Sequence, residues 1–142
     1  MQITRSVETA ASPTAVFAYL SDFTTTTEWD PGTVRTTRVS GEGGVGTTYH
    51  NVSKFAGRET ELTYAVTEHQ PDTRFALRGE NKTVIARDTM EMSPSGTGTR
   101  VTYTADFEFK GLAKYAAPFM GSAFRKLGDE AEHGLREALA KL

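Results

Sequence analysis

The C-terminal part of the chain carries the pattern that most constrains its fold. From about Pro118 onward, apolar residues recur at steps of three and four, with charged residues between them. The apolar stripe consists of Met120, Phe124, Leu127, Ala131, Leu135, Ala138 and Leu142. This spacing predicts one long helix, which at ~1.5 Å per residue extends roughly 36 Å and crosses a whole small sheet. Where a curved sheet and a straight helix diverge they leave a gap, and we expect the functional site in that gap.

The rest of the chain reads mainly as strands. Ser12 is a good helix cap and Pro13 suits a first helical position, so a short helix is expected there. A second helical turn is expected over residues 23–29, ended by the turn sequence Asp30-Pro31-Gly32. Alternating apolar and polar residues, bounded by Gly and Pro, predict strands at residues 2–9, 33–39, 47–55, 58–69, 74–78, 83–92 and 100–109.

Composition excludes several classes of protein. The chain has 142 residues, a formal net charge of −2 and no cysteine, so disulfides, thiolate nucleophiles and cysteine metal sites are excluded. Basic residues are scattered among acidic ones, which argues against nucleic acid as a partner. Its three histidines stand far apart, so we expect no metal and no cofactor. No signal-like or membrane-spanning apolar run occurs, and a cytoplasmic location is expected.

Several short motifs along the chain carry a resemblance to a known superfamily. They are Ser12-Pro13 with Val16-Phe17 and Leu20-Ser21-Asp22, Glu28-Trp29, Gly46-Thr47, Val66-Thr67-Glu68 with Pro71, Gly98-Thr99-Arg100-Val101-Thr102, and the closing amphipathic helix. With these the chain resembles the START-like, or SRPBCC, superfamily, and more narrowly its polyketide cyclase/dehydrase-type members.

The resemblance implies an α+β helix-grip fold over residues 1–142 as one domain. In that fold a seven-stranded antiparallel sheet wraps around the last helix, two short helices follow the first strand, and a cavity lies between sheet and helix. The superfamily holds lipid carriers, hormone receptors, cyclases and hydroxylase domains, so the resemblance alone does not determine the activity.

Strand alternation indicates which side chains face the cavity. Tyr64 shares a face with Leu62 and Val66, and Tyr103 and Phe107 share one with Val101, Ala105 and Phe109. Met90 and Met92 define the inner face of their strand, which places Asp88 on it as well. A carboxyl group in an apolar cavity has a raised pKa and can act as a general acid or base. Alternatively, Asp88 lies near the open mouth, or pairs with an inward arginine or a tyrosine hydroxyl.

Two further segments contribute candidates. Tyr49, Asn51, Ser53 and Phe55 share one face of their strand, where Asn51 and Ser53 either bind a ligand or satisfy one another. Trp29 follows the second short helix and is expected at the edge, or lip, of the cavity mouth. There it either covers a bound ligand or packs the short helices against the sheet. The candidate ligand-binding residues are Trp29, Tyr49, Asn51, Tyr64, Phe75, Asp88, Met90, Tyr103 and Phe107.

Three functions compete. The first is binding or carrying a small hydrophobic molecule, such as a lipid or polyketide-like compound. The second is an aromatase/cyclase-type enzyme that uses Asp88 with the hydroxyl of Tyr64 or Tyr103. The third is a domain that works through protein contacts, which the concentration of aromatic residues on inner faces disfavours. The sequence leaves open whether the protein is an enzyme, and it fits a monomer or a homodimer.

Overall fold

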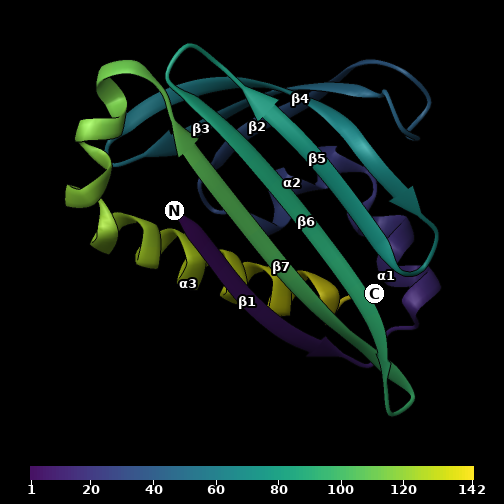
Figure 1. Ribbon diagram of the computed structural model, residues 1–142. Helices are drawn as coiled ribbons and strands as arrows, with labels where there is room; N and C mark the ends of the chain where they lie inside the picture. Colours follow the sequence, from purple (N-terminus) through teal and green to yellow (C-terminus); the bar gives the residue numbers. More distant parts are fainter.

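A seven-stranded antiparallel sheet curves around one long helix (Figure 1). The computed structural model describes residues 1–142. Its strands are β1 (Gln2–Thr9), β2 (Thr33–Ser40), β3 (Thr48–Phe55), β4 (Arg58–Gln70), β5 (Arg74–Glu80), β6 (Val84–Ser95) and β7 (Gly98–Phe109). Their order in the sheet is β1-β7-β6-β5-β4-β3-β2, so β2 to β7 form a meander and only β1 pairs with a strand distant in sequence. The expected helix-grip fold is confirmed.

The helices fill the concave side and the ends of the sheet. They are α1 (Pro13–Leu20), η1 (Phe23–Thr25), α2 (Thr26–Trp29), η2 (Gly111–Tyr115), η3 (Ala117–Phe119) and α3 (Gly121–Leu139), where η denotes a 3-10 helix. As predicted, the Ser12 hydroxyl accepts a hydrogen bond from the Ala15 amide at 3.2 Å and caps α1.

The long helix starts later than the sequence pattern predicts. Met120 has a φ of −102° and a ψ of 9°, which is not helical, so α3 begins at Gly121 and residues 111–119 form the two 3-10 turns instead. The hairpin between β6 and β7 also differs from the prediction. It turns at Gly96, whose φ is +59°, so pairing extends to Ser95 and Gly98, and the loop is shorter than expected.

The two halves of α3 meet different surroundings. Toward the C-terminus, Leu135 and Leu139 are fully buried in the main core with Val7, Val16 and Phe75. Toward its start, Met120, Leu127 and Ala131 of the predicted stripe border open space under the sheet. The predicted gap therefore lies under the first half of the helix.

Close backbone contacts hold α3 in place. A Cβ atom added at Gly134 would lie 1.8 Å from the carbonyl oxygen of Trp29, at the end of α2. One added at Gly128 would lie 2.6 Å from Ile3 of β1. These two glycines therefore allow α3 to lie close to α2 and to β1. At Gly121 the nearest atom is the end of the Arg125 side chain, at 3.4 Å.

Candidate functional site

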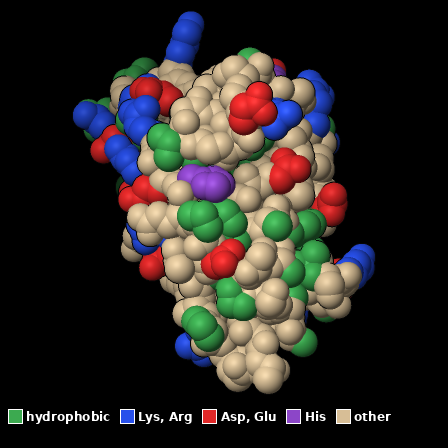
Figure 2. Space-filling model, turned by 90° about the vertical axis from the view of Figure 1, so that its right-hand side faces the viewer, with side chains coloured by type: hydrophobic (Ala, Val, Ile, Leu, Met, Phe, Trp, Pro, Cys, Tyr) green, Lys and Arg blue, Asp and Glu red, His purple; other side chains and the backbone are tan.

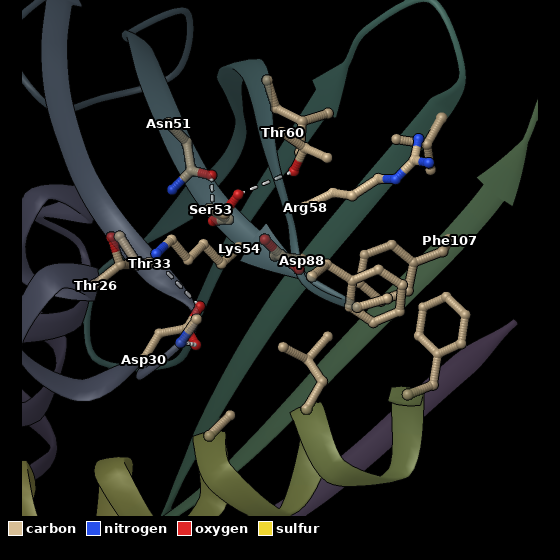
Figure 3. Close-up of a pocket in the computed structure, with 18 of the residues that line it drawn as sticks. Thr26, Asp30, Thr33, Asn51, Ser53, Lys54, Arg58, Thr60, Asp88 and Phe107 are labelled. Atoms are coloured by element: carbon tan, nitrogen blue, oxygen red, sulfur yellow. Dashed lines mark hydrogen bonds between the residues drawn. The ribbon is translucent and has the colours of Figure 1, made fainter. Parts of the chain in front are cut away.

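A cavity of about 490 Å³ lies between α3 and the curved sheet. This volume is within the range of small-molecule sites, and most of the lining residues are apolar. Lining residues that are exposed or half-buried mark its mouth. On one side is the β3–β4 hairpin with Lys54, Ala56 and Arg58, and on the other are Ala113 and Ala116 of the 3-10 turns. Figure 3 shows the strands on one side of this space and α3 on the other.

Asp88 is the central polar group of the cavity. It comes from β6, is 5% exposed, and lies among the labelled lining side chains in Figure 3. The hydroxyl of Tyr103, on neighbouring β7, donates a hydrogen bond to Asp88 Oδ1 at 3.3 Å. Tyr64 of β4 lies beside the same carboxyl group and lines the same cavity. The tyrosine pairing that the sequence left as an alternative is therefore present.

Burial sets the protonation of these three groups. Desolvation, with a smaller contribution from the negative charge of Asp30, raises the pKa of Asp88 to about 7, although hydrogen bonds from Tyr103 and Tyr64 act in the opposite direction. Desolvation also raises the pKa of Tyr64 and of Tyr103 well above the ordinary value, and the nearby Asp88 carboxylate adds to this. The two tyrosines thus remain hydrogen-bond donors at neutral pH, while Asp88 is close to half protonated.

A second acid, Asp30, lines the cavity at the end of α2. Its Oδ1 accepts a hydrogen bond from the Gly32 amide at 3.0 Å, and its Oδ2 accepts one from the Thr33 hydroxyl at 3.0 Å. Desolvation raises the pKa of Asp30 as well, while these two hydrogen bonds partly counteract the rise. Neither Asp30 nor Asp88 forms an ion pair, so no protein cation balances charge in the interior.

A chain of polar side chains holds a second part of the cavity wall, and Figure 3 shows its link between Asn51 and Ser53. Thr26 and Thr36 share a hydrogen bond of 2.7 Å between their hydroxyls. Asn51 Nδ2 donates to Thr36 Oγ1 at 2.9 Å, and Ser53 Oγ donates to Asn51 Oδ1 at 2.7 Å. Asn51 and Ser53 therefore satisfy one another, which is one of the two outcomes expected from the sequence. The network joins α2, β2 and β3 across the cavity wall.

The structure brings six of the nine candidate residues to the cavity surface. These are Trp29, Asn51, Tyr64, Asp88, Tyr103 and Phe107. The other three, Tyr49, Phe75 and Met90, are each at most 1% exposed and belong to the main core. They share the inner face of the sheet, as strand alternation predicts, but other side chains already fill the space beside them. Phe23 of η1 packs on Tyr49, and α1 packs against β5 and β6, which carry Phe75 and Met90.

Trp29 lies deeper than expected. It is 2% exposed, its ring meets that of Tyr103 edge-on at 5.5 Å, and its indole Nε1 is buried without a hydrogen-bond partner. The expectation that it forms a lip of the cavity is wrong, because α2 turns inward against α3 at Gly134. Trp29 instead closes the inner end.

Several lining residues are not among the candidates that the sequence suggests. The sequence pattern places Asp30 in a turn and Lys54 and Arg58 at the flanks of a hairpin, and it assigns no role to Ala113 and Ala116. The one available signal is that Asp30 directly follows the candidate Trp29.

No helix of the chain combines the length and apolar character needed to cross a membrane. No group of three or more His, Asp or Glu side chains is arranged to hold a metal ion.

Comparison with known proteins defines the class to which this fold and cavity belong. Residues 1–141 match the family described as polyketide cyclase / dehydrase and lipid transport. The chain belongs to this family, within the START/SRPBCC superfamily. A comparison with the sequences of curated proteins finds no match.

Solved structures share the fold at low sequence identity. The ZhuI aromatase/cyclase from Streptomyces sp. R1128 is 14% identical, with a TM-score of 0.83 over 98% of this chain and 93% of that one. A START superfamily protein from Mycobacterium smegmatis is 14% identical, with a TM-score of 0.80 over 97% and 96%. The protein TTHA0849 from Thermus thermophilus is 17% identical, with a TM-score of 0.80 over 98% and 97%.

Proposed function

We propose that the cavity binds a small, largely hydrophobic molecule that places one polar group against Asp88, Tyr64 and Tyr103. The observation that carries this proposal is the convergence of these three groups at one place in a cavity whose lining residues are mostly apolar. Apolar walls supply affinity through burial, and a few fixed polar groups supply orientation. Because the pKa of Asp88 is about 7, its carboxyl group can donate to a ligand oxygen or accept from a ligand hydroxyl near neutral pH.

The ligand preference can be measured by competition. A hydrophobic fluorophore bound in the cavity should change the emission of Trp29, because this residue, the only tryptophan, lines the cavity. 1-Naphthol should displace that fluorophore at concentrations about tenfold lower than naphthalene, because only naphthol can hydrogen-bond to the polar group.

The Tyr103→Phe variant should lose most of this difference while still binding the fluorophore. Tyr115→Phe is the matched control, since Tyr115 is 66% exposed and lies outside the cavity lining, and it should behave as wild type. If naphthol and naphthalene displaced the fluorophore at equal concentrations, the role of Asp88, Tyr64 and Tyr103 in orienting a ligand would be contradicted. Absence of any binding would contradict the proposal itself.

A second candidate function is aldol cyclisation of a poly-β-ketone chain, favoured by the contact between Asp88 and Tyr103 and by the pKa of about 7. The Asp88 carboxylate would take a proton from a methylene group between two carbonyls, and a tyrosine hydroxyl would stabilise the enolate oxygen. The enolate carbon would then bond to a second carbonyl carbon, whose oxygen takes the proton back from Asp88. This C–C bond closes the ring. Asp88 would then remove a second α-proton and pass it to the hydroxyl group, which leaves as water while a C=C bond forms.

Incubation with a synthetic poly-β-keto thioester tests this reaction. Mass spectrometry should detect a product that has lost one water, and kcat/KM should rise with pH through a single ionisation near 7. Asp88→Asn should remove that product. If Asp88→Asn still bound the chain and cyclised it at the wild-type rate, the catalytic role would be lost while the binding proposal stood.

A further inference from the structure

Three strongly exposed apolar side chains belong to one segment of eight residues beside the cavity mouth. Leu112 is 86% exposed, Tyr115 66% and Phe119 88%, and all three belong to the 3-10 turns η2 and η3. Side chains three residues apart in a 3-10 helix lie on the same side, which aligns Leu112 with Tyr115. Exposed apolar residues that gather in one place mark an interaction surface more often than isolated ones do.

The same segment also forms part of the cavity wall. Ala113, Ala116 and Met120 alternate with the exposed residues and line the cavity. We call residues 110–120 the portal segment. In Figure 1 it is the green coil that precedes α3, at the same end of the molecule as the β3–β4 hairpin. Its apolar outer surface therefore adjoins the opening through which a ligand would pass.

Positive charge surrounds this opening. The portal segment contains Lys110 and Lys114 and no acidic residue, and residues 53–58 of the facing hairpin contain Lys54 and Arg58 and no acidic residue. Lys54, Arg58 and Lys114 form no ion pair, although Lys110 binds Glu80 at 2.7 Å. Three of the sixteen Lys and Arg residues of the chain thus stand without an acidic partner at the mouth, although the whole chain carries a net charge of −2.

The opposite end of the molecule lacks this combination. Figure 2 shows that end, where apolar side chains occur in small groups separated by polar and charged atoms. Exposed apolar residues elsewhere, such as Val39 at 64% and Val45 at 67%, belong to β2 and the β2–β3 loop, at the other end of β3 from the hairpin.

We propose that the portal segment docks on the surface of an anionic lipid bilayer, with the cavity mouth facing the membrane. Leu112, Tyr115 and Phe119 would enter the boundary between headgroups and acyl chains, while Lys54, Arg58 and Lys114 would meet lipid phosphates. A tyrosine beside a lysine suits this boundary, and Lys114 Nζ lies 5.2 Å from the centre of the Tyr115 ring. The proposal rests on the proposed function, because it gives a hydrophobic ligand a route to the cavity that avoids water.

Vesicle flotation tests the docking surface with the full chain. Wild type should float with vesicles that contain phosphatidylglycerol, float much less with vesicles of phosphatidylcholine alone, and detach as salt is added. The double variant Leu112→Ser with Phe119→Ser should lose binding by about tenfold or more, since it removes most of the inserted apolar surface. Lys114→Glu should weaken binding to the anionic vesicles alone.

The double variant Val39→Ser with Val45→Ser is the matched control, because it removes two apolar side chains of comparable exposure at the other end of the protein. It should float as wild type does. The Leu112/Phe119 variant should keep wild-type fluorophore binding in solution, since neither residue lines the cavity.

Absence of flotation by wild type, or equal loss in both double variants, would overturn the docking proposal. If fluorophore binding persisted in that case, the proposed function would stand without it. A concentration-dependent dimer that the Leu112/Phe119 variant abolishes, without vesicle binding, would assign the surface to a second copy of the chain instead.

Discussion

Replacing Gly134 with alanine should destabilise the protein by about 2–4 kcal/mol, one of the largest effects expected from adding a single methyl group. The new Cβ would lie 1.8 Å from the Trp29 carbonyl oxygen, far inside contact distance. The oxygen belongs to the backbone and the Cβ is bonded directly to it, so neither atom can rotate away. Either α3 or the end of α2 must therefore move. Since Trp29 closes the inner end of the cavity, the shift should also change its fluorescence and lower fluorophore affinity. Urea denaturation gives the free energy of unfolding.

Gly121→Ala is the matched control in the same helix. There the nearest atom to the new Cβ is the flexible end of Arg125, at an ordinary contact distance of 3.4 Å. Alanine favours helix over glycine, so this variant should equal wild type or be slightly more stable. Equal stability of both alanine variants would mean that α3 is not held against α2 at Gly134.

The second large effect is a dependence of stability on pH that comes from Asp88. Its pKa is about 7 in the folded protein and 3.8 in an unperturbed carboxyl group, so between these values the folded state holds a proton that the unfolded state has released. The contribution of Asp88 to the free energy of unfolding is then greatest below about pH 4, and it falls as the pH rises to about 7. A difference of about three pH units corresponds to roughly 4 kcal/mol.

Comparison with Asp88→Asn isolates this contribution, because asparagine resembles the neutral carboxyl group and does not titrate. The variant should match wild type near pH 4 and exceed its free energy of unfolding by up to about 4 kcal/mol near pH 8. Glu42→Gln, at an exposed carboxylate in the β2–β3 loop that forms no ion pair, is the control and should follow wild type across the range. A variant less stable than wild type at pH 8 would reveal a cationic partner for Asp88.

The sequence predicted the sheet and the final helix well because both rest on periodic burial. Alternation in β4, β6 and β7 placed Tyr64, Asp88 and Tyr103 on one face, and the structure brings them together in the cavity. The alternation of apolar and polar residues could not show how much of the space under the curved sheet the helix occupies. Phe75 and Met90 point to the same side of the sheet as the lining residues, but they lie in the part of the core that other side chains fill.

The cavity mouth was harder to predict, since it depends on irregular backbone. The apolar spacing of Met120 and Phe124 continues the pattern of α3, yet the preceding turns are 3-10 helices and their small residues face the cavity. Likewise, the inward turn of Trp29 depends on Gly134, more than one hundred residues along the chain. Contacts of this kind leave no local periodic signal.

The pairing of β1 with β7 determines when the protein can fold. Gln2 lies opposite Asp106 and Thr9 opposite Thr99, so the first strand has no partner until residues 99–106 have been synthesised. The meander from β2 to β7 can form earlier, since each of its strands pairs with the next. The helix α3 follows all seven strands along the chain, and until it is made the apolar inner face of the sheet remains open to water and to other chains. During synthesis on the ribosome, the sheet is therefore most vulnerable to aggregation before α3 emerges.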